Sequence, residues 1–233
     1  MTGHEAYDRG SPVQWFLGRP SKDLKAELLP AVGAARAIAL PAGGAEVLDI
    51  GCGDGRDTLF LASLGHRATG VDIGAPAIQK ARETQAKASA AQNDAGGQLF
   101  ANLQFVHYDV LQLPAPQAPL DLIWDNTIYC NLRIEFLAEV LALLGRLTTP
   151  GRTFYLLNCG NANAPEIVGG HPRLREATIR RELGGLFDFL KVYEGHYDMK
   201  MSTKALKRRA SRWNLDNQAV LSWTVVMRRK KLA

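Results

Sequence analysis

The segment Glu46-Val-Leu-Asp-Ile-Gly-Cys-Gly-Asp-Gly55, followed by Gly70-Val-Asp72-Ile73, decides the fold. In it an apolar run ends in an acid, three glycines stand at alternate positions, and a second apolar run ends in another acid. The first run has the β-branched residues of a buried parallel strand. Glycine lacks a Cβ, so Gly51 and Gly53 let the backbone turn tightly and approach a ligand. Asp72 ends the next strand, where a carboxylate can bind a ribose diol. The pattern therefore predicts half of a nucleoside-binding site.

The spacing of the glycines indicates which nucleoside derivative binds. Dinucleotide sites usually have the pattern G-x-G-x-x-G, which places a pyrophosphate at a helix N-terminus. Here the spacing is G-x-G-x-G, and Asp49 and Asp54 flank the turn. Two carboxylates repel a pyrophosphate but favour a ligand with an ammonium and a sulfonium group, such as S-adenosylmethionine. The alternative is a tight turn in an unrelated α/β domain.

The segment VLDIGCGDG, together with the acid at Asp72, resembles the first motif of the class I S-adenosylmethionine-dependent methyltransferases. The resemblance implies an α/β, Rossmann-like fold with a seven-stranded, mostly parallel sheet, an antiparallel last strand and helices on both faces. It also implies S-adenosyl-L-methionine as the cofactor and S-adenosyl-L-homocysteine as the product.

The segments 12–24 (PVQWFLGRPSKDL) and 51–73 resemble the thiopurine, thiol/halide and tellurite-resistance branch of small-molecule methyltransferases. In that branch an aromatic N-terminal segment folds over the bound cofactor, which implies such a role for Trp15, with Phe16 and Arg19 near it. The alternative is an aromatic patch that packs an N-terminal arm against the core.

Apolar strands alternate with amphipathic helices along most of the chain, which favours a parallel sheet covered by helices. Ser21 is a plausible N-cap for a short helix that has Leu24 and Leu28 on one face. We expect the first five strands at 46–50, 67–72, 103–107, 120–125 and 153–158. We expect later helices at 56–64, from Pro76 onward, at 133–147 with Phe136 facing the sheet, and at 178–187.

The last two predicted strands, 189–194 and 220–228, have no crossover helix between them. We therefore expect an antiparallel pair, with the basic stretch 200–213 as an excursion between its strands.

Length and composition fit one methyltransferase domain of 233 residues. We divide it into an N-terminal arm and helix that cover the cofactor (1–40), a cofactor-binding core (41–160), and a substrate-side loop, helix and edge strands (161–233). No apolar run approaches the roughly 20 residues of a membrane helix, and the N-terminus lacks the pattern of a secretory signal. The three cysteines form no CxxC pair, so neither a disulfide framework nor a zinc site is expected. We expect a cytoplasmic monomer or homodimer with no membrane association.

Positive charge is concentrated near the C-terminus. From position 196 onward there are ten Lys or Arg and two Asp, a net charge of +8, whereas the whole chain carries +5. A nucleic-acid footprint is one interpretation, and a solvated loop with a basic tail is the other. Aromatic and basic residues do not interleave elsewhere as in RNA-binding surfaces. We therefore expect no nucleic-acid partner and keep RNA or protein methylation as an alternative function.

Further candidate residues follow from the strand ends, because open α/β sheets bind ligands at their carboxyl edge. The family resemblance implies that Asp109 and the backbone of Val110 contact adenine. It also implies that Asp125 and Asn126 lie near the methionine moiety and the transferred methyl group. The alternatives are turn, capping and packing roles. The predicted cofactor-binding residues are Trp15, Asp49, Gly51, Cys52, Gly53, Asp72, Ile73, Asp109, Val110, Asp125 and Asn126.

The predicted reaction is in-line transfer of a methyl group to a small-molecule acceptor, a thiol first and then an amine or hydroxyl. A hydroxyl or ammonium acceptor needs a proton acceptor, and the predicted catalytic residues are Asp125, Tyr129 and His171. His171 lies in a Gly/Asn/Pro loop after the fifth strand, where it could cover a substrate. The acid pattern of the metal-dependent methyltransferases is incomplete, so no metal is expected. A module that binds the cofactor without catalysis is a further alternative.

Overall fold

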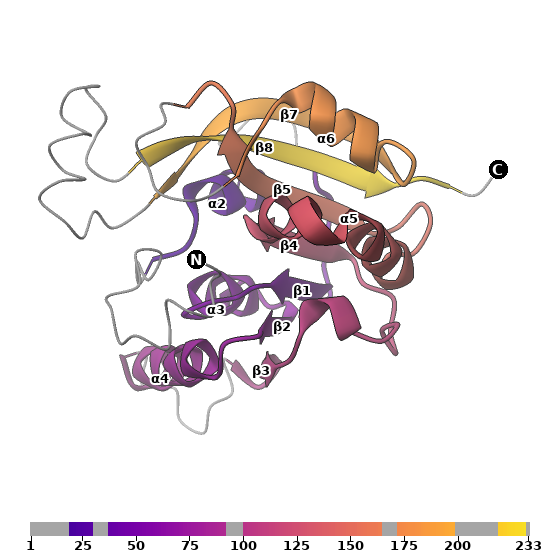
Figure 1. Ribbon diagram of the computed structural model, residues 1–233. Coiled ribbons are helices and arrows are strands. Elements are labelled where there is room, and N and C mark those ends of the chain that lie inside the picture. Colours follow the sequence, from indigo (N-terminus) through magenta and orange to yellow (C-terminus); the bar gives the residue numbers. More distant parts are fainter. Residues whose placement is uncertain (1–18, 30–36, 92–99, 165–171, 199–218, 232–233) are drawn as a thin grey trace, which may run out of the picture.

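A mixed β-sheet with helices on both faces forms the centre of the structure (Figure 1). The computed structural model describes residues 19–29, 37–91, 100–164, 172–198 and 219–231. Within these ranges the long strands lie in the order β3-β2-β1-β4-β5-β8-β7, and a two-residue strand, β6, pairs with β5. The strands are β1 (Glu46–Ile50), β2 (Arg67–Asp72), β3 (Leu103–His107), β4 (Leu122–Asn126), β5 (Phe154–Asn161), β6 (Arg173–Leu174), β7 (Phe187–Asp198) and β8 (Ala219–Arg229). This order confirms the predicted α/β, Rossmann-like fold.

Strand β8 runs against both of its neighbours. The pairs from β3 through β2, β1 and β4 to β5 are all parallel, whereas β8 pairs antiparallel with β5 and with β7. The predicted antiparallel pair at the end of the chain is thus confirmed. The basic stretch 200–213 between these two strands lies outside the described residues.

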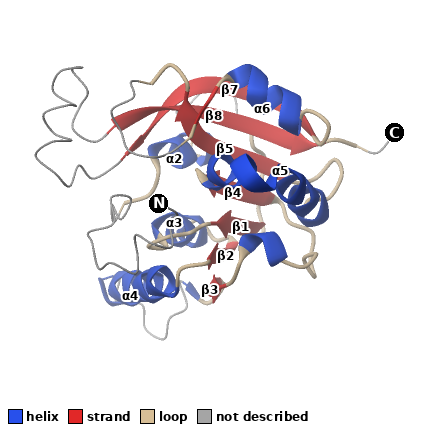
Figure 2. Ribbon diagram, in the orientation of Figure 1, coloured by secondary structure: helices blue, strands red, loops and turns tan. Residues whose placement is uncertain are grey.

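The helices divide between the two faces of the sheet (Figure 2). Helices α2 (Lys22–Leu28), α3 (Arg56–Ser63) and α4 (Ala75–Ala91) contribute buried side chains to one apolar core with β1, β4 and β5. Helices α5 (Ile128–Leu147) and α6 (Glu176–Leu183), with the 3-10 turn η2 (Val110–Gln112), contribute to a second core on the other face. Alternate residues of the central strands therefore point into different cores.

Helix α5 begins five residues earlier than the sequence predicts. It starts at Ile128 because the carboxylate of Asp125 accepts hydrogen bonds from the backbone N–H groups of Ile128 and Tyr129. The prediction that Phe136 faces the sheet is wrong: its backbone is non-helical (φ −128°, ψ 37°), and its side chain is 40% exposed. This break shifts the inward face, which contains Val140, Leu143, Leu144 and Leu147.

The other boundary corrections lie near the ends of elements. The predicted helix 178–187 runs from Glu176 to Leu183 and ends at Gly184, so β7 already begins at Phe187. Ser21 lies at the predicted N-cap of α2, but its hydroxyl makes no capping hydrogen bond. Its backbone N–H instead donates to Asp57 on α3 at 2.6 Å, which ties the start of α2 to α3.

The three cysteines are buried free thiols. Burial raises the pKa of Cys52, Cys130 and Cys159, which keeps these thiols protonated and unreactive. In the described part of the chain, no helix has the length and apolar character needed to cross a membrane. The same residues contain no group of three or more His, Cys, Asp or Glu arranged to hold a metal.

Glycine is required at two positions of the turn after β1. Gly51 has φ +71°, and a Cβ atom placed there would lie 2.1 Å from the side chain of Ile128. Gly55 has φ +75°, and a Cβ there would lie 2.6 Å from the ring of Phe105. The turn therefore lies directly against α5 on one side and against β3 on the other.

Replacing Gly51 by Ala should lower the free energy of unfolding by about 2–4 kcal/mol, because the left-handed backbone and the clash with Ile128 both oppose a Cβ. Urea denaturation followed by circular dichroism measures this. Gly43→Ala is the matched control, since a Cβ at Gly43 meets no atom within 4 Å, and it should change stability by less than about 0.5 kcal/mol. Equal effects of the two changes would contradict the assignment.

Candidate functional site

Asp72 joins the two turns that follow β1 and β2. Its carboxylate accepts hydrogen bonds from the backbone N–H of Gly53 at 2.9 Å and of Gly74 at 2.8 Å. The structure thus brings the predicted residues Gly53 and Asp72 together at the carboxyl edge of the sheet. Because a carboxylate oxygen can accept more than one hydrogen bond, this arrangement orients Asp72 for a diol.

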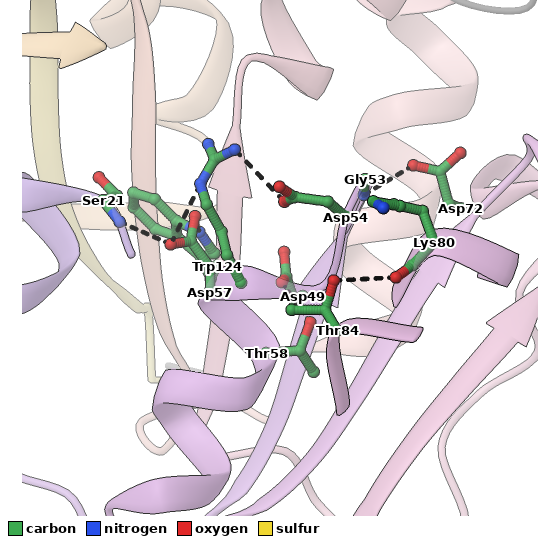
Figure 3. Close-up of polar contacts among 11 residues, drawn as sticks. Ser21, Asp49, Gly53, Asp54, Asp57, Thr58, Asp72, Lys80, Thr84 and Trp124 are labelled. Atoms are coloured by element: carbon green, nitrogen blue, oxygen red, sulfur yellow. Dashed lines mark hydrogen bonds and ion pairs between the residues drawn. The ribbon is translucent and has the colours of Figure 1, made fainter. Parts of the chain in front are cut away.

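A group of buried acids surrounds the same turn (Figure 3). Asp49 accepts a hydrogen bond from the Thr58 hydroxyl at 2.6 Å. Asp57 accepts one from the indole N–H of Trp124 at 3.0 Å, in addition to that from Ser21. Asp54 forms an ion pair with Arg56, in which Asp54 Oδ1 and Arg56 Nη1 lie 3.4 Å apart. These four carboxylates, which include Asp72, make the turn strongly acidic.

The protonation of Asp49 indicates the charge of the ligand that fits. Burial raises the pKa of Asp49 well above its usual value, the nearby Asp57 raises it further, and the Thr58 hydroxyl opposes the shift. A cation placed beside these groups would favour their ionised form. The residues present therefore fit the ammonium and sulfonium groups of S-adenosylmethionine, and they do not fit a pyrophosphate.

An apolar edge lies beside Asp72. Ile73 and Tyr108 are each 44% exposed, and the backbone N–H of Tyr108 donates to the Asp72 carbonyl at 3.0 Å. Exposed apolar side chains next to an acid that is predicted to bind ribose suit a purine ring. Tyr108 was not predicted from the sequence, although its position directly before Asp109 could have indicated it.

Asp109 and Val110 lie at the same edge, beyond β3. The carboxylate of Asp109 accepts the N–H of Leu111 at 3.0 Å and caps η2. The Val110 side chain is buried in the core, so only its backbone is available to a ligand. The adenine contacts predicted for these two residues are compatible with these positions and stay predictions.

Asp125 is placed on the other face of the sheet from Asp49 and Asp57. It is fully buried. Its carboxylate caps α5 and also accepts a hydrogen bond from the Tyr155 hydroxyl at 2.6 Å. Burial raises its pKa from 3.8 to about 6, and its three donors oppose that shift. These contacts support the capping role, and the predicted catalytic role has no geometric support from them.

Tyr129 is also engaged within the protein. Its hydroxyl donates to Glu182 at 2.6 Å, and Arg133 donates to the same carboxylate, which holds α5 against α6. Burial and the adjacent Glu182 raise the pKa of Tyr129. Asn126 is half-buried at the end of β4 and pairs in register with Asn158 of β5. Trp15, Phe16 and His171 lie outside the described residues, and the exposed Arg19 precedes α2.

Two buried acids of α2 were not predicted from the sequence. Asp23 accepts a hydrogen bond from the side-chain amide of Asn158 on β5. The Glu27 carboxylate accepts hydrogen bonds from two residues of β7, the Lys191 ammonium at 2.6 Å and the Tyr193 hydroxyl at 2.8 Å. The spacing of the two acids by four residues, beside Leu24 and Leu28, is the signal that could have placed them on the inward face. They hold the N-terminal helix over the carboxyl half of the sheet.

A methyltransferase-domain family matches residues 42–179, which include the glycine turn, Asp72 and the strands that carry the acids. The chain belongs to the S-adenosylmethionine-dependent methyltransferases. The cofactor of this family is S-adenosylmethionine, whose positively charged groups fit the acidic turn. The narrower resemblance to the thiopurine and tellurite-resistance branch stays a prediction.

Curated relatives of the methyltransferase match about half of its chain. The 2-heptyl-1-hydroxyquinolin-4(1H)-one methyltransferase of Mycobacteroides abscessus is 28% identical over 128 residues, which cover 54% of this chain and 52% of the relative. The malonyl-[acyl-carrier protein] O-methyltransferase of Pseudescherichia vulneris is 29% identical over 125 residues, which cover 53% of this chain and 42% of the relative. The chain spans about half the length of the curated relatives it matches.

Solved structures share the fold of the methyltransferase. A protein described in work on the conversion of a disulfide bond into a thioacetal group during echinomycin biosynthesis superposes with a TM-score of 0.69 at 21% identity, covering 98% of this chain and 92% of its own. TehB from Haemophilus influenzae superposes with a TM-score of 0.57 at 20% identity, covering 82% of this chain and 59% of its own.

Asp125→Asn should change how stability depends on pH. Below about pH 4 the Asp125 carboxyl is protonated in both the folded and the unfolded protein, so its raised pKa does not change stability there. As pH rises toward 6 the unfolded protein ionises Asp125 while the folded protein keeps the proton, so the wild type loses stability. The variant lacks this loss, and its stability relative to wild type should rise by on the order of 3 kcal/mol between pH 4 and 7.

Urea titrations of both proteins at several pH values measure this difference. Asp188→Asn, at an exposed position of β7, is the control for the loss of a surface carboxyl and should not reproduce the rise expected for Asp125→Asn. A pH-independent difference for Asp125→Asn would contradict the raised pKa.

Asp72→Ala should weaken binding of S-adenosylhomocysteine at least about tenfold, because it removes a charge-assisted acceptor and releases the N–H groups of Gly53 and Gly74. Isothermal titration calorimetry measures the affinity, with Asp188→Ala as the control. Unchanged affinity in the Asp72 variant would remove the ribose assignment.

Proposed function

We propose that the protein transfers a methyl group from S-adenosylmethionine to a small-molecule nucleophile. The observation that carries the proposal is the acidic glycine turn joined to Asp72 by the Gly53 N–H, within the segment that matches the methyltransferase family. An acidic turn next to the exposed side chains of Ile73 and Tyr108 suits both ends of this cofactor.

The protein acts in this reaction mainly by positioning. When bound, the cofactor supplies an electrophilic methyl group on a positively charged sulfur. Asp72 orients the ribose, Ile73 and Tyr108 flank the adenine, and Asp49 with its neighbours balances the positive charge. Holding the methyl group and its acceptor in line can lower the barrier by several kcal/mol.

The acceptor is a small molecule in this proposal, with a thiol, amine or hydroxyl as the nucleophile. The names of two relatives, a hydroxyquinolone methyltransferase and an O-methyltransferase, support a small or carrier-bound acceptor with oxygen chemistry. The thiol preference comes only from the sequence resemblance. A thiolate needs little help from a base, whereas a hydroxyl or ammonium group needs a proton acceptor, and His171 stays a candidate for that role.

A methyl-transfer assay across thiols, amines, phenols and carboxylates tests the proposal by measuring S-adenosylhomocysteine against an acceptor-free blank. At least one acceptor should raise product formation, and Asp72→Ala should reduce it. Tight cofactor binding without turnover of any acceptor would favour a non-catalytic binding module. Failure to bind the cofactor would overturn the assignment of the site itself.

A further inference from the structure

The sheet face beneath α2 changes from apolar to polar toward its carboxyl edge. Val47 of β1, Leu122 of β4, Leu156 of β5 and Val226 of β8 all belong to the apolar core on this face. Two residues further along β5 stands Asn158, and the facing strand β8 contributes Thr224 and Ser222. All three polar residues are fully buried.

Three polar atoms of this cluster are buried without a hydrogen-bond partner. Within the described part of the chain they are Asn158 Oδ1, Ser222 Oγ and Thr224 Oγ1. The Thr224 hydroxyl is close enough to the Asp23 carboxylate to lower its pKa, so Asn158 Oδ1 and Ser222 Oγ are the two that remain for a ligand. The Asn158 amide nitrogen donates to Asp23, which fixes the amide orientation and leaves its oxygen as the unpaired end. Because a buried acceptor without a donor is unfavourable, such atoms call for a ligand or an ordered water.

Small residues surround the unpaired hydroxyl. In the register of the sheet, Ser222 pairs with Gly160 of β5 on one side and with Gly195 of β7 on the other. The Asp23 carboxylate lies against Gly195, 2.6 Å from where a Cβ would stand. Because Gly195 has no side chain, the Asp23 carboxylate of α2 can approach β7 beside Ser222.

The cluster lies next to the predicted methyl-transfer position. Asn158 pairs with Asn126 at the end of β4, and its carbonyl accepts the N–H of Thr127 at 2.8 Å. Trp124 of β4, on the same face, donates to Asp57 of the acidic turn. Asn158 is thus one strand beyond β4 and Ser222 two strands beyond it, on the sheet face that carries Asp49.

We propose that Asn158 and Ser222 form the subsite that binds an O–H or N–H group of the methyl acceptor, with Asp23 as a positioning residue. The proposal rests on the proposed function. The donor group of the acceptor hydrogen-bonds to Asn158 Oδ1, and the Ser222 hydroxyl either accepts from it or donates back. Neither atom is exposed, so a group bound to them is shielded from solvent. The subsite selects for acceptors that carry such a donor, whichever atom is methylated.

Binding to the full-length protein saturated with S-adenosylhomocysteine tests the subsite. The probes are three pairs that differ in one donor hydrogen: phenol and anisole, 4-hydroxyquinoline and 4-methoxyquinoline, and indole and 1-methylindole. The wild type should bind the donor member of at least one pair about tenfold more tightly. Ser222→Ala and Asn158→Leu should each bring that ratio close to one, while the affinity for S-adenosylhomocysteine stays within about twofold.

Ser63→Ala is the matched control, because the Ser63 hydroxyl is exposed and bonds locally to the Phe60 carbonyl; it should leave the ratio unchanged. Without probes, Ser222→Ala should melt at or above the wild-type temperature, since it removes an unpaired buried hydroxyl. A lower melting temperature with an unchanged ratio would assign the cluster to structural water and overturn the subsite, as would a lack of donor preference in all three pairs. If the wild type does not bind S-adenosylhomocysteine at all, the proposed function fails rather than the subsite alone.

Discussion

The hydrogen bonds from the N–H groups of Gly53 and Gly74 to Asp72 fix the geometry of the carboxyl edge. They join the turn after β1 to the turn after β2, and a charged acceptor makes them stronger than bonds between neutral groups. Held there, the turn places Gly51 against Ile128 at the start of α5 and Gly55 against Phe105 of β3. One side chain thus joins the turns that follow β1 and β2, and the first of these turns packs against both α5 and β3.

A second layer of the architecture also depends on buried carboxylates. The Asp57 carboxylate accepts hydrogen bonds from the backbone N–H of Ser21 and the indole N–H of Trp124. The start of α2, helix α3 and strand β4 therefore meet at one side chain. Asp23 and Glu27 attach α2 to β5 and β7 through polar contacts, although Leu24 and Leu28 of the same helix are buried among apolar residues. Buried acids are unfavourable without donors, so each of them specifies the position of its partners.

The sequence predicted the parts of the fold that rest on local patterns. The bounds of β1, β2 and β3 agree with prediction, because each is a short apolar run that ends at a turn or a polar residue. The antiparallel end of the sheet followed from the lack of a crossover helix. At the site, the spacing of motif and acid predicted that the glycine turn and Asp72 lie together, and the structure adds the hydrogen bond from the Gly53 N–H that joins them.

The remaining features depend on contacts that the sequence does not show. An acid at a strand end can bind a ligand or cap a helix, and for Asp125 only the structure reveals the three donors of the capping arrangement. Asp23 and Asn158 are 135 residues apart, so nothing local distinguishes the inward acids of α2 from a solvated helix face. The break at Phe136 likewise has no Pro or Gly beside it to mark it.

The reversed direction of β8 places its two ends at opposite edges of the sheet. Ser222 near its start lies at the edge that carries the acidic turn, whereas Arg228 pairs with the first residue of β5 at the opposite edge. Arg228 lines a cavity of about 380 Å³ there, together with Arg152 and its ion-pair partner Asp121. Six residues of extended chain span about 20 Å, so this cavity and the acidic turn lie a strand length apart and share no side chain.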